Sequence, residues 1–102
     1  MIHLNSLIQD LGRLIFNNGA LEDIESKNNE IITACDRLID EHGEGSDIGK
    51  LLINIHYGAR KIRDYLKKGF NYSLAQNTVE YMKGRIRRIG DILKIEFEET
   101  QK

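Results

Sequence analysis

"NYSLAQNTVEYMKGRIRRIGDIL", residues 71–93, carries the clearest periodicity in the chain. Its apolar residues recur at alternating spacings of four and three, which places their side chains on one face of an α-helix. Asn71 or Ser73 can begin this helix by accepting a hydrogen bond from a free N–H of the first turn. The stretch predicts a helix whose buried stripe consists of Ala75, Val79, Met82, Ile86, Ile89 and Leu93.

Three further segments with the same rhythm precede this helix. The first ends in the Asn-Asn-Gly stretch at 17–19, where a left-handed residue can stop a helix. The second begins at Leu21 and ends before Gly43, and the third is capped by Ser46 and ends at Gly69. Because each segment has one apolar face, four such helices can bury these faces only against one another. The sequence predicts an all-α protein, an antiparallel four-helix bundle, and the long stripes of the last two helices also leave a homodimer open.

Length and composition narrow the class of protein. A chain of 102 residues with 40% hydrophobic and 30% charged residues is expected to fold as one helical-bundle domain, residues 1–102. Cys35 is the single cysteine, so no internal disulfide is expected. The first residues lack the features of a secretory signal, and no apolar run approaches the about 20 residues that cross a bilayer. We expect a cytoplasmic protein.

Two glycines fall inside the predicted third and fourth helices. Gly58 lies within the apolar stripe of the third helix and Gly90 within that of the fourth, and each costs about 1 kcal/mol relative to alanine in a helix interior. A close backbone approach between the two helices would justify that cost. We therefore expect both glycines at the interface of these helices.

Charge divides the chain into two opposite halves, although the formal net charge is only −1. Residues 1–48 contain ten acidic and three basic residues, whereas residues 49–95 contain eleven basic and three acidic residues. One interpretation is that the halves pack together and neutralise each other, with Arg60, Lys61 and Arg63 paired with acids of the second helix. The other is a basic patch for an anionic partner.

No group of residues in the sequence points to catalysis. His3, His42 and His56 lie on three different segments, and no Cys/His spacing is typical of a zinc site. The stretch "HGEGSDIGK", residues 42–50, lacks the preceding strand of a phosphate-binding loop and the Ser or Thr after its lysine. We expect a protein that is not an enzyme and has no metal or cofactor.

Nucleic-acid binding is the alternative function. Arginines beside aromatic rings can neutralise phosphates and stack on bases. Ten basic residues lie within residues 60–94, and the aromatic residues among them are Tyr65, Phe70, Tyr72 and Tyr81. Against this function, the basic residues of the fourth helix surround its axis, and the pI near 6.3 indicates no overall cationic field. The alternative is a small nucleic-acid-binding regulatory protein that uses the basic C-terminal helices.

A resemblance to a known family rests on residues 46–93, "SDIGKLLINIHYGARKIRDYLKKGFNYSLAQNTVEYMKGRIRRIGDIL". A helix opens after a small polar loop and carries the pair Leu52 and Ile53, and it ends in basic residues. A link of hydrophobic, polar, aromatic and Ser residues follows at 70–73, and the last helix repeats isoleucine at Ile86, Ile89 and Ile92. This half of the chain resembles the immunity proteins of lactic acid bacteria and their relatives that protect producers from class IIa, or pediocin-like, bacteriocins.

The resemblance implies a non-catalytic four-helix bundle in the cytoplasm of a Gram-positive bacterium. Such a protein would bind the membrane receptor of the bacteriocin, the mannose phosphotransferase permease, or the complex of this receptor with bacteriocin. A basic surface would also favour peripheral contact with the anionic inner face of the membrane. The partner-binding residues expected in the basic, aromatic-flanked half are Arg60, Lys61, Arg63, Lys67, Lys68, Tyr72, Lys83, Arg85, Arg87, Arg88, Lys94 and Phe97.

Two features depart from the pattern of the family. Many relatives place a proline just before the third helix, where this chain has Ser46 and Asp47. The chain also ends in "KIEFEETQK", residues 94–102, a charged and helix-compatible segment with Phe97 as its one aromatic residue.

Overall fold

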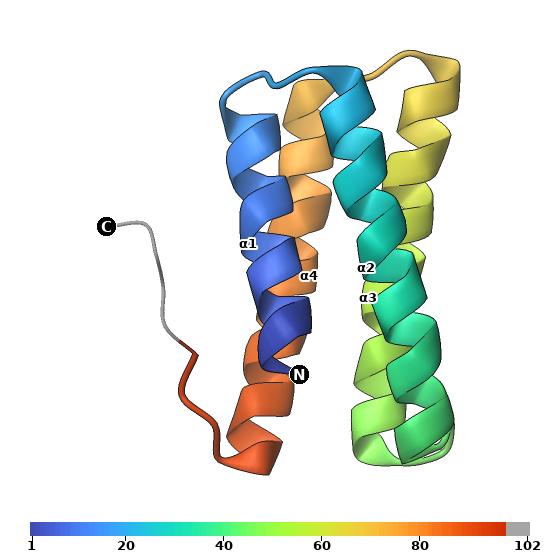
Figure 1. Ribbon diagram of the computed structural model, residues 1–102, viewed down its shortest axis with the longest axis vertical. Helices are drawn as coiled ribbons and strands as arrows, with labels where there is room; N and C mark the ends of the chain where they lie inside the picture. Colours follow the sequence, from blue (N-terminus) through green and yellow to red (C-terminus); the bar gives the residue numbers. More distant parts are fainter. Residues whose placement is uncertain (98–102) are drawn as a thin grey trace.

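Four helices make up almost all of the computed structural model, which describes residues 1–97. They are α1 (Ile2–Phe16), α2 (Leu21–His42), α3 (Asp47–Lys68) and α4 (Tyr72–Leu93). Successive helices run in opposite directions and are joined by short connections (Figure 1). Residues 1–97 contain no β-strand. The predicted all-α, antiparallel four-helix bundle is therefore confirmed.

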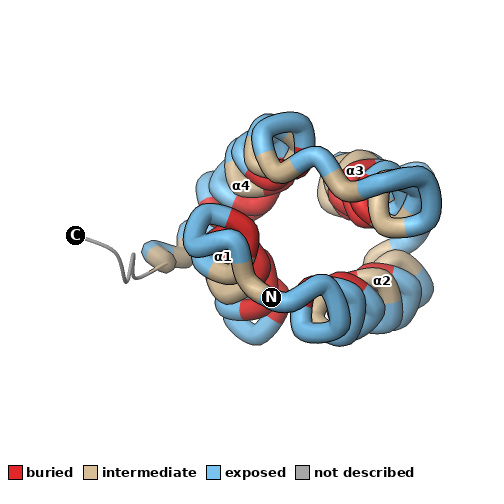
Figure 2. The backbone as a smooth tube through the Cα atoms, turned by 90° about the horizontal axis from the view of Figure 1, so that it is seen from above, coloured by how far each residue is buried: buried red, intermediate tan, exposed pale blue. Residues whose placement is uncertain are grey.

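The helices form a ring in which each one packs against two neighbours. The contacting pairs are α1 with α2, α2 with α3, α3 with α4, and α4 with α1. Figure 2 shows the bundle from above, with the buried faces of all four helices turned toward its centre. The stripe predicted for α4 is buried there, although Leu93 at its end is only partly buried. The hydrophobic spacing of the sequence therefore identified the core face of this helix.

Side-chain caps determine where α3 and α4 begin. Ser46 Oγ accepts a hydrogen bond from the Gly49 N–H at 2.9 Å, and Asn71 Oδ1 accepts one from the Leu74 N–H at 3.0 Å. Each bond satisfies one of the backbone donors that the first turn of a helix leaves without a partner. Of the two predicted starts of α4, Asn71 is thus the cap, and Ser73 lies inside the helix.

The ends of the first three helices follow the predicted stops. Gly43 and Gly69, which come directly after α2 and α3, have φ angles of 87° and 115°, a region that disfavours residues with a Cβ. In the Asn-Asn-Gly stretch after α1, the left-handed residue is Asn18, with φ of 54°. Asparagine tolerates this conformation better than most residues, so Gly19 is not the one that reverses the chain.

The two mid-helix glycines have different neighbours, and the prediction was right for only one. A Cβ on Gly58 would lie 2.6 Å from Cγ of Met82, which confirms a close approach between α3 and α4. A Cβ on Gly90 would instead lie 2.8 Å from Cε2 of Phe97. The expected contact of Gly90 with α3 was therefore wrong, because this glycine accommodates the segment that follows its own helix.

That segment turns back immediately after α4. Lys94 adopts the left-handed conformation with φ of 60°, and the Ile95 N–H donates to the Gly90 carbonyl at 2.8 Å. This arrangement closes the helix at Leu93 and brings Phe97 over Gly90. Residues 95–97 are not helical, which corrects the expectation of a helix-compatible tail for this part, and residues 98–102 lie outside the described residues.

A buried asparagine joins α2 to α3 and so connects the two halves of the chain. Asn28 is 1% exposed, and its Nδ2 donates to the Ala59 carbonyl at 2.8 Å. Its Oδ1 is also buried and finds no hydrogen-bond partner within residues 1–97. The bond to Ala59 therefore makes Asn28 sensitive to substitution, whereas the unpaired oxygen is itself a cost to stability.

Candidate partner-binding surface

A groove between α3 and α4 has a largely apolar lining and is flanked by basic residues. It encloses about 310 Å³ and is lined by Tyr57, Gly58, Lys61, Tyr65, Leu74, Asn77, Thr78 and Tyr81. Tyr57 is 51% exposed, Leu74 is 48% exposed and Tyr81 is 38% exposed. Large apolar side chains that are grouped and exposed in this way mark interaction surfaces more often than single exposed ones do.

The groove arises from side chains that lie just beside the core stripes. Tyr57, Lys61 and Tyr65 follow one another at spacings of four and form a row along the side of α3 that faces α4. Thr78 of α4 meets this row, and its hydroxyl oxygen lies 3.4 Å from the hydroxyl oxygen of Tyr65. Gly58 forms part of the lining between these rows, and its missing side chain lets α4 come close.

Three cationic groups lie over two tyrosine rings beside this groove. The Arg60 guanidinium is 5.8 Å and the Lys61 ammonium 5.6 Å from the centroid of the Tyr57 ring. On the opposite helix, the Arg85 guanidinium is 4.8 Å from the centroid of the Tyr81 ring. A cation above an aromatic face is attracted by the ring but keeps its full charge. The rings therefore hold the cations in place without neutralising them.

No carboxylate within residues 1–97 forms an ion pair with these cations, although Arg60 also lines a hollow between α2 and α3 that contains Asp36, Asp40 and Glu44. Among the described residues, no acid lines the groove itself. Of the eleven basic residues in 49–95, Lys83 is the one that forms an ion pair in the described part of the chain, with Glu80 at 3.5 Å. The basic half of the protein thus presents its charge outward.

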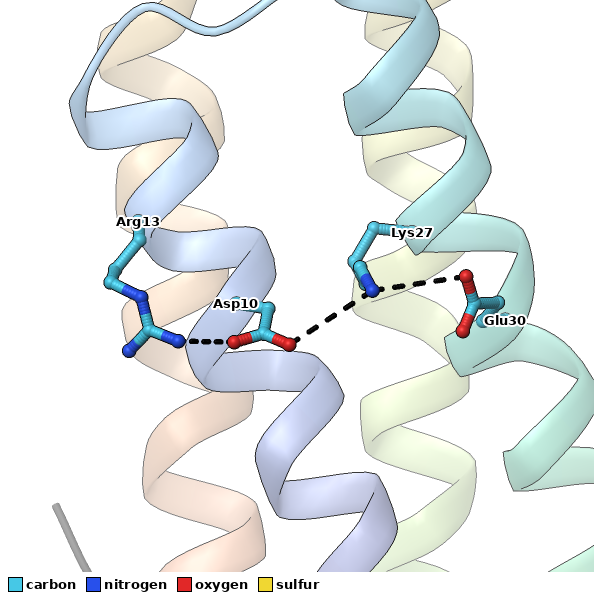
Figure 3. A network of polar contacts seen from close by, with 4 residues as sticks. All are labelled: Asp10, Arg13, Lys27 and Glu30. Carbon is cyan, nitrogen blue, oxygen red and sulfur yellow. Dashed lines mark hydrogen bonds and ion pairs between the residues drawn. The ribbon is translucent and has the colours of Figure 1, made fainter. Parts of the chain in front are cut away.

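In the acidic half, residues 1–48, the few basic residues do form ion pairs. Arg13, Lys27 and Arg37 are the three basic residues of residues 1–48, and each of them forms an ion pair. Figure 3 shows Lys27 between two carboxylates: its Nζ lies 3.9 Å from Asp10 Oδ2 and 3.8 Å from Glu30 Oε2, and Asp10 also contacts Arg13. This network links α1 to α2.

The interpretation that the two halves neutralise each other is therefore wrong at the level of ion pairs. Among residues 1–97, no Lys or Arg of 49–95 forms an ion pair with an acid of 1–48. Within the described residues, the contact between a His, Lys or Arg of one half and an acid of the other is His56 Nε2 to Asp36 Oδ1, at 3.0 Å. The predicted pairing of Arg60, Lys61 and Arg63 with acids of α2 does not occur in this part of the chain.

The predicted partner-binding residues are spread over several sides of the bundle. Lys61 lines the groove, Arg85 flanks it over the Tyr81 ring, and Arg88 follows Tyr81 by seven residues on the same side of α4. Arg60 contacts the Tyr57 ring but also lines, with His56, the hollow between α3 and α2. Two others, Arg63 and Lys67, follow His56 at seven and eleven residues and so share its α2-facing side.

The remaining members lie further away. Lys83 approaches α1, because a Cβ on Gly12 would lie 3.3 Å from Lys83 Cε, and Arg87 follows Lys83 by four residues on the same side. Near the helix ends, Lys68 is the last residue of α3 and Lys94 comes directly after α4. These residues and the groove do not form one cluster.

Two of the predicted residues have contacts that support the fold. The Tyr72 hydroxyl donates to the Gly19 carbonyl at 2.9 Å, and its ring meets Phe70 edge-on with centroids 4.8 Å apart. Phe97 packs over Gly90 and lines a hollow beside α1. Their aromatic character therefore has a structural reason at both positions.

Sequence reasoning missed the residues that shape the groove. Tyr57 and Leu74 were not among the expected contact residues, and Tyr65 and Tyr81 were considered only for nucleic-acid stacking. The available signal was the row at 57, 61 and 65, which repeats every four residues next to the core stripe of α3. It became a groove wall only because α4 lies on that side.

The reactive side chains of the described residues lie apart from the groove. Cys35 is fully buried, and desolvation, with a smaller contribution from the Asp36 charge, raises the pKa of its thiol from 9.0 to about 12. Within residues 1–97, no three His, Cys, Asp or Glu side chains are close enough together to hold a metal ion. What the groove offers a partner is apolar contact, tyrosine hydroxyls and positive charge that forms no ion pair within residues 1–97.

Comparison with known proteins finds no family model, no curated protein sequence and no solved structure that matches this chain. None of the helices within residues 1–97 has the length and apolar character needed to cross a membrane.

Proposed function

We propose that this protein is a non-catalytic immunity protein that protects a Gram-positive cell from a pediocin-like bacteriocin. Its partner in this proposal is the mannose phosphotransferase permease, or the complex of this receptor with bacteriocin, on the cytoplasmic side of the membrane. The resemblance of residues 46–93 to the immunity proteins motivates the proposal. The observation that supports it is the groove of the same two helices, where exposed tyrosines lie beside cations that form no ion pair within residues 1–97.

The charge distribution would bring such a protein to its partner. Each Lys or Arg near an anionic membrane surface contributes roughly 1 kcal/mol of attraction. Apart from Lys83, the Lys and Arg side chains of α3 and α4 form no ion pair within residues 1–97, so their charge is available for this attraction. Peripheral binding would concentrate the protein beside a membrane-embedded receptor, and the groove would then make the specific contacts.

The test is protection of a sensitive Gram-positive strain that expresses this chain, challenged with a panel of class IIa bacteriocins beside a vector control. We expect survival against at least one member of the panel. The triple variant Arg85→Glu, Arg87→Glu and Arg88→Glu should lose protection while its circular dichroism spectrum and melting temperature stay close to those of the wild type. Killing by every member despite folded expression would contradict the proposal, and so would full protection by the folded triple variant.

The same proteins distinguish the alternative function. A nucleic-acid-binding regulator that uses the basic C-terminal helices would bind oligonucleotides with an affinity that falls steeply as salt rises. Fluorescence anisotropy with labelled single-stranded and double-stranded oligonucleotides measures this directly. Tight, salt-dependent binding that the triple variant abolishes, together with no protection from any bacteriocin, would favour that alternative.

A further inference from the structure

The groove between α3 and α4 has two chemically different ends. At one end, Tyr65 of α3 lies beside Leu74 and Thr78 of α4, and none of these side chains is charged. At the other end, Tyr57 and Tyr81 carry three cations on their rings. The groove therefore has a direction: an apolar end near the α3–α4 connection and a cationic, aromatic end further along the bundle.

The geometry points to a helical segment of a partner protein as the occupant of this groove, with an apolar side chain at the Tyr65–Leu74 end and carboxylates at the Tyr57–Tyr81 end. This inference rests on the proposed function in that it names the chemistry of the partner surface. An amphipathic helix lying in a groove between two helices is a recurrent mode of protein recognition. Complementary charge at one end would set the direction in which the helix binds.

The dimensions of the groove bound the length of the partner segment. Residues 57–65 span about 12 Å along α3 at the rise of an α-helix, which is the length of roughly two helical turns. Two apolar side chains of the partner, spaced by four residues, fit this length. A carboxylate about one turn beyond them would reach the guanidinium of Arg85, and a second carboxylate one turn further would reach that of Arg88.

The same features disfavour the other occupants. A second copy bound through the same face would bring no acidic residue to Lys61 and Arg85, because no acid within residues 1–97 lines the groove, and would bring two faces of like charge together. A nucleic acid needs cations spaced along its backbone, whereas the three cations beside this groove lie at its Tyr57–Tyr81 end. A membrane surface is flat and would leave the groove unfilled. An acidic amphipathic helix uses both the apolar and the charged end.

The test uses a phage library of 16-residue peptides in a helix-favouring sequence, selected against the full chain. We expect enriched peptides to carry Leu, Ile or Phe at positions four apart and Asp or Glu one turn beyond. A synthetic copy of the most enriched peptide should shift the amide signals of residues 57–65 and 74–81 in a two-dimensional NMR spectrum. Replacing its acidic residues by lysine should weaken binding by about tenfold or more.

Two matched double variants locate the binding site. Lys61→Glu with Arg85→Glu should weaken the peptide by about tenfold or more, whereas Arg63→Glu with Lys67→Glu, the same change of charge outside the groove, should change the affinity less than about twofold. Tyr57→Ala with Leu74→Ala removes apolar contact without changing charge and should also weaken binding by about tenfold. These side chains are exposed or partly exposed, so melting temperatures should show that all variants fold.

Several outcomes would overturn the inference. They are a selection that enriches no helical motif or enriches basic peptides, amide shifts that fall outside the groove, and equal effects of the two charge variants. Stronger competition by a 15-residue oligothymidylate or by phosphatidylglycerol vesicles than by the acidic peptide would reassign the site to nucleic acid or membrane. Sedimentation that shows self-association abolished by Lys61→Glu with Arg85→Glu would reassign it to a second copy of this chain.

Protection assays separate this inference from the proposed function. If the wild type binds the acidic peptide in the groove but protects against no bacteriocin, the immunity function fails and the groove assignment stands. If the wild type protects and both the Lys61/Arg85 and the Tyr57/Leu74 variants protect equally well, immunity stands and the groove is not the contact surface.

Discussion

The helix pairs α1/α2 and α3/α4 are similar in architecture but distribute charge in opposite ways. In α1/α2, each of the three basic residues pairs with an acid, and Lys27 bridges two carboxylates across the helices. In α3/α4, the basic residues outnumber the acids, and within residues 1–97 Lys83 is the one that has an ion-pair partner. One pair uses its cations to connect helices, and the other presents them to solvent.

The difference teaches what holds the two halves together. Opposite net charges suggest mutual attraction, yet within residues 1–97 the contacts between the halves are apolar packing, the hydrogen bonds of Asn28 to Ala59 and of Tyr72 to Gly19, and the contact of His56 with Asp36. Surface ion pairs contribute little to stability in general, so a bundle can dispense with them. The cations of α3 and α4 are then free to serve recognition.

The largest loss of stability is expected from a substitution at the contact between the two halves. Asn28→Asp puts a carboxylate where an amide donates to the Ala59 carbonyl, in a site that is 1% exposed. Two oxygens would face each other and a charge would be buried, which should lower the free energy of unfolding by about 3 kcal/mol or more at pH 7. Urea denaturation followed by far-ultraviolet circular dichroism measures this change.

The loss from Asn28→Asp should depend on pH in a defined direction. Burial raises the pKa of such a carboxyl in the folded state, so the cost is full above that raised value and shrinks as pH falls toward the ordinary value near about 3.9. Asn28→Leu, which introduces no charge, should cost less than about 1.5 kcal/mol and should not vary with pH in this way. Equal stabilities of Asn28→Asp and Asn28→Leu at pH 7 would show that this contact does not join the halves.

The next effect tests the close packing of α3 on α4. Gly58→Leu should lower the free energy of unfolding by about 2 kcal/mol, because its Cβ would lie 2.6 Å from Met82 Cγ. Gly84→Leu is the matched control: a Cβ there meets nothing within 4 Å, so the better helix propensity of leucine should stabilise the protein by about 0.5–1 kcal/mol. Melting temperatures that shift in the same direction for both variants would contradict the proposed origin of the groove.

A smaller effect compares one lysine from each helix pair. Lys27→Glu removes two ion-pair contacts and places a third carboxylate beside Asp10 and Glu30, so it should cost about 1 kcal/mol. Lys61→Glu removes a cation that has no carboxylate partner within residues 1–97 and should change stability by less than about 0.5 kcal/mol. Chemical denaturation of both variants at low ionic strength checks the comparison, and a greater loss for Lys61→Glu would reverse it.

The smallest effect is expected from salt. Raising sodium chloride from 50 to 500 mM shortens the Debye length to a few ångströms and screens interactions between exposed charges. If packing rather than charge joins the halves, the free energy of unfolding should change by less than about 0.5 kcal/mol over this range. A steady loss of stability of several kcal/mol would mean that charge attraction between the halves is essential after all.

Much of the fold was predictable because it depends on local spacing. The stripe at 75–89 identified the buried face of α4, and Ser46 capped α3 as expected, since a cap acts on the turn directly beside it. The role of Gly90 was not predictable in this way. Its neighbour is Phe97, which reaches it only because Lys94 turns the chain back after α4.

For the candidate site, the sequence predicted only that it lies in the basic, aromatic-rich half of the chain. Arg60, Lys61 and Arg85 were expected contacts and do flank the groove, whereas Arg63 and Lys67 lie on another side of α3. Tyr57 was missed, because an exposed tyrosine beside a core stripe has no significance until a second helix lies next to it.

The amino-acid sequence by itself determined the number of helices, the ends of the first three, their core faces and the opposite charges of the two halves. Each of these features depends on residues within a few helical turns of one another, where the spacing along the chain fixes which side of the helix a side chain occupies. The tertiary structure decided which cations find carboxylates, and that Tyr57, Leu74 and Tyr81 line one groove. Those outcomes depend on how each helix is rotated against its neighbours, and this rotation follows from the packing of the whole core. The close contact of Met82 with Gly58 is one example.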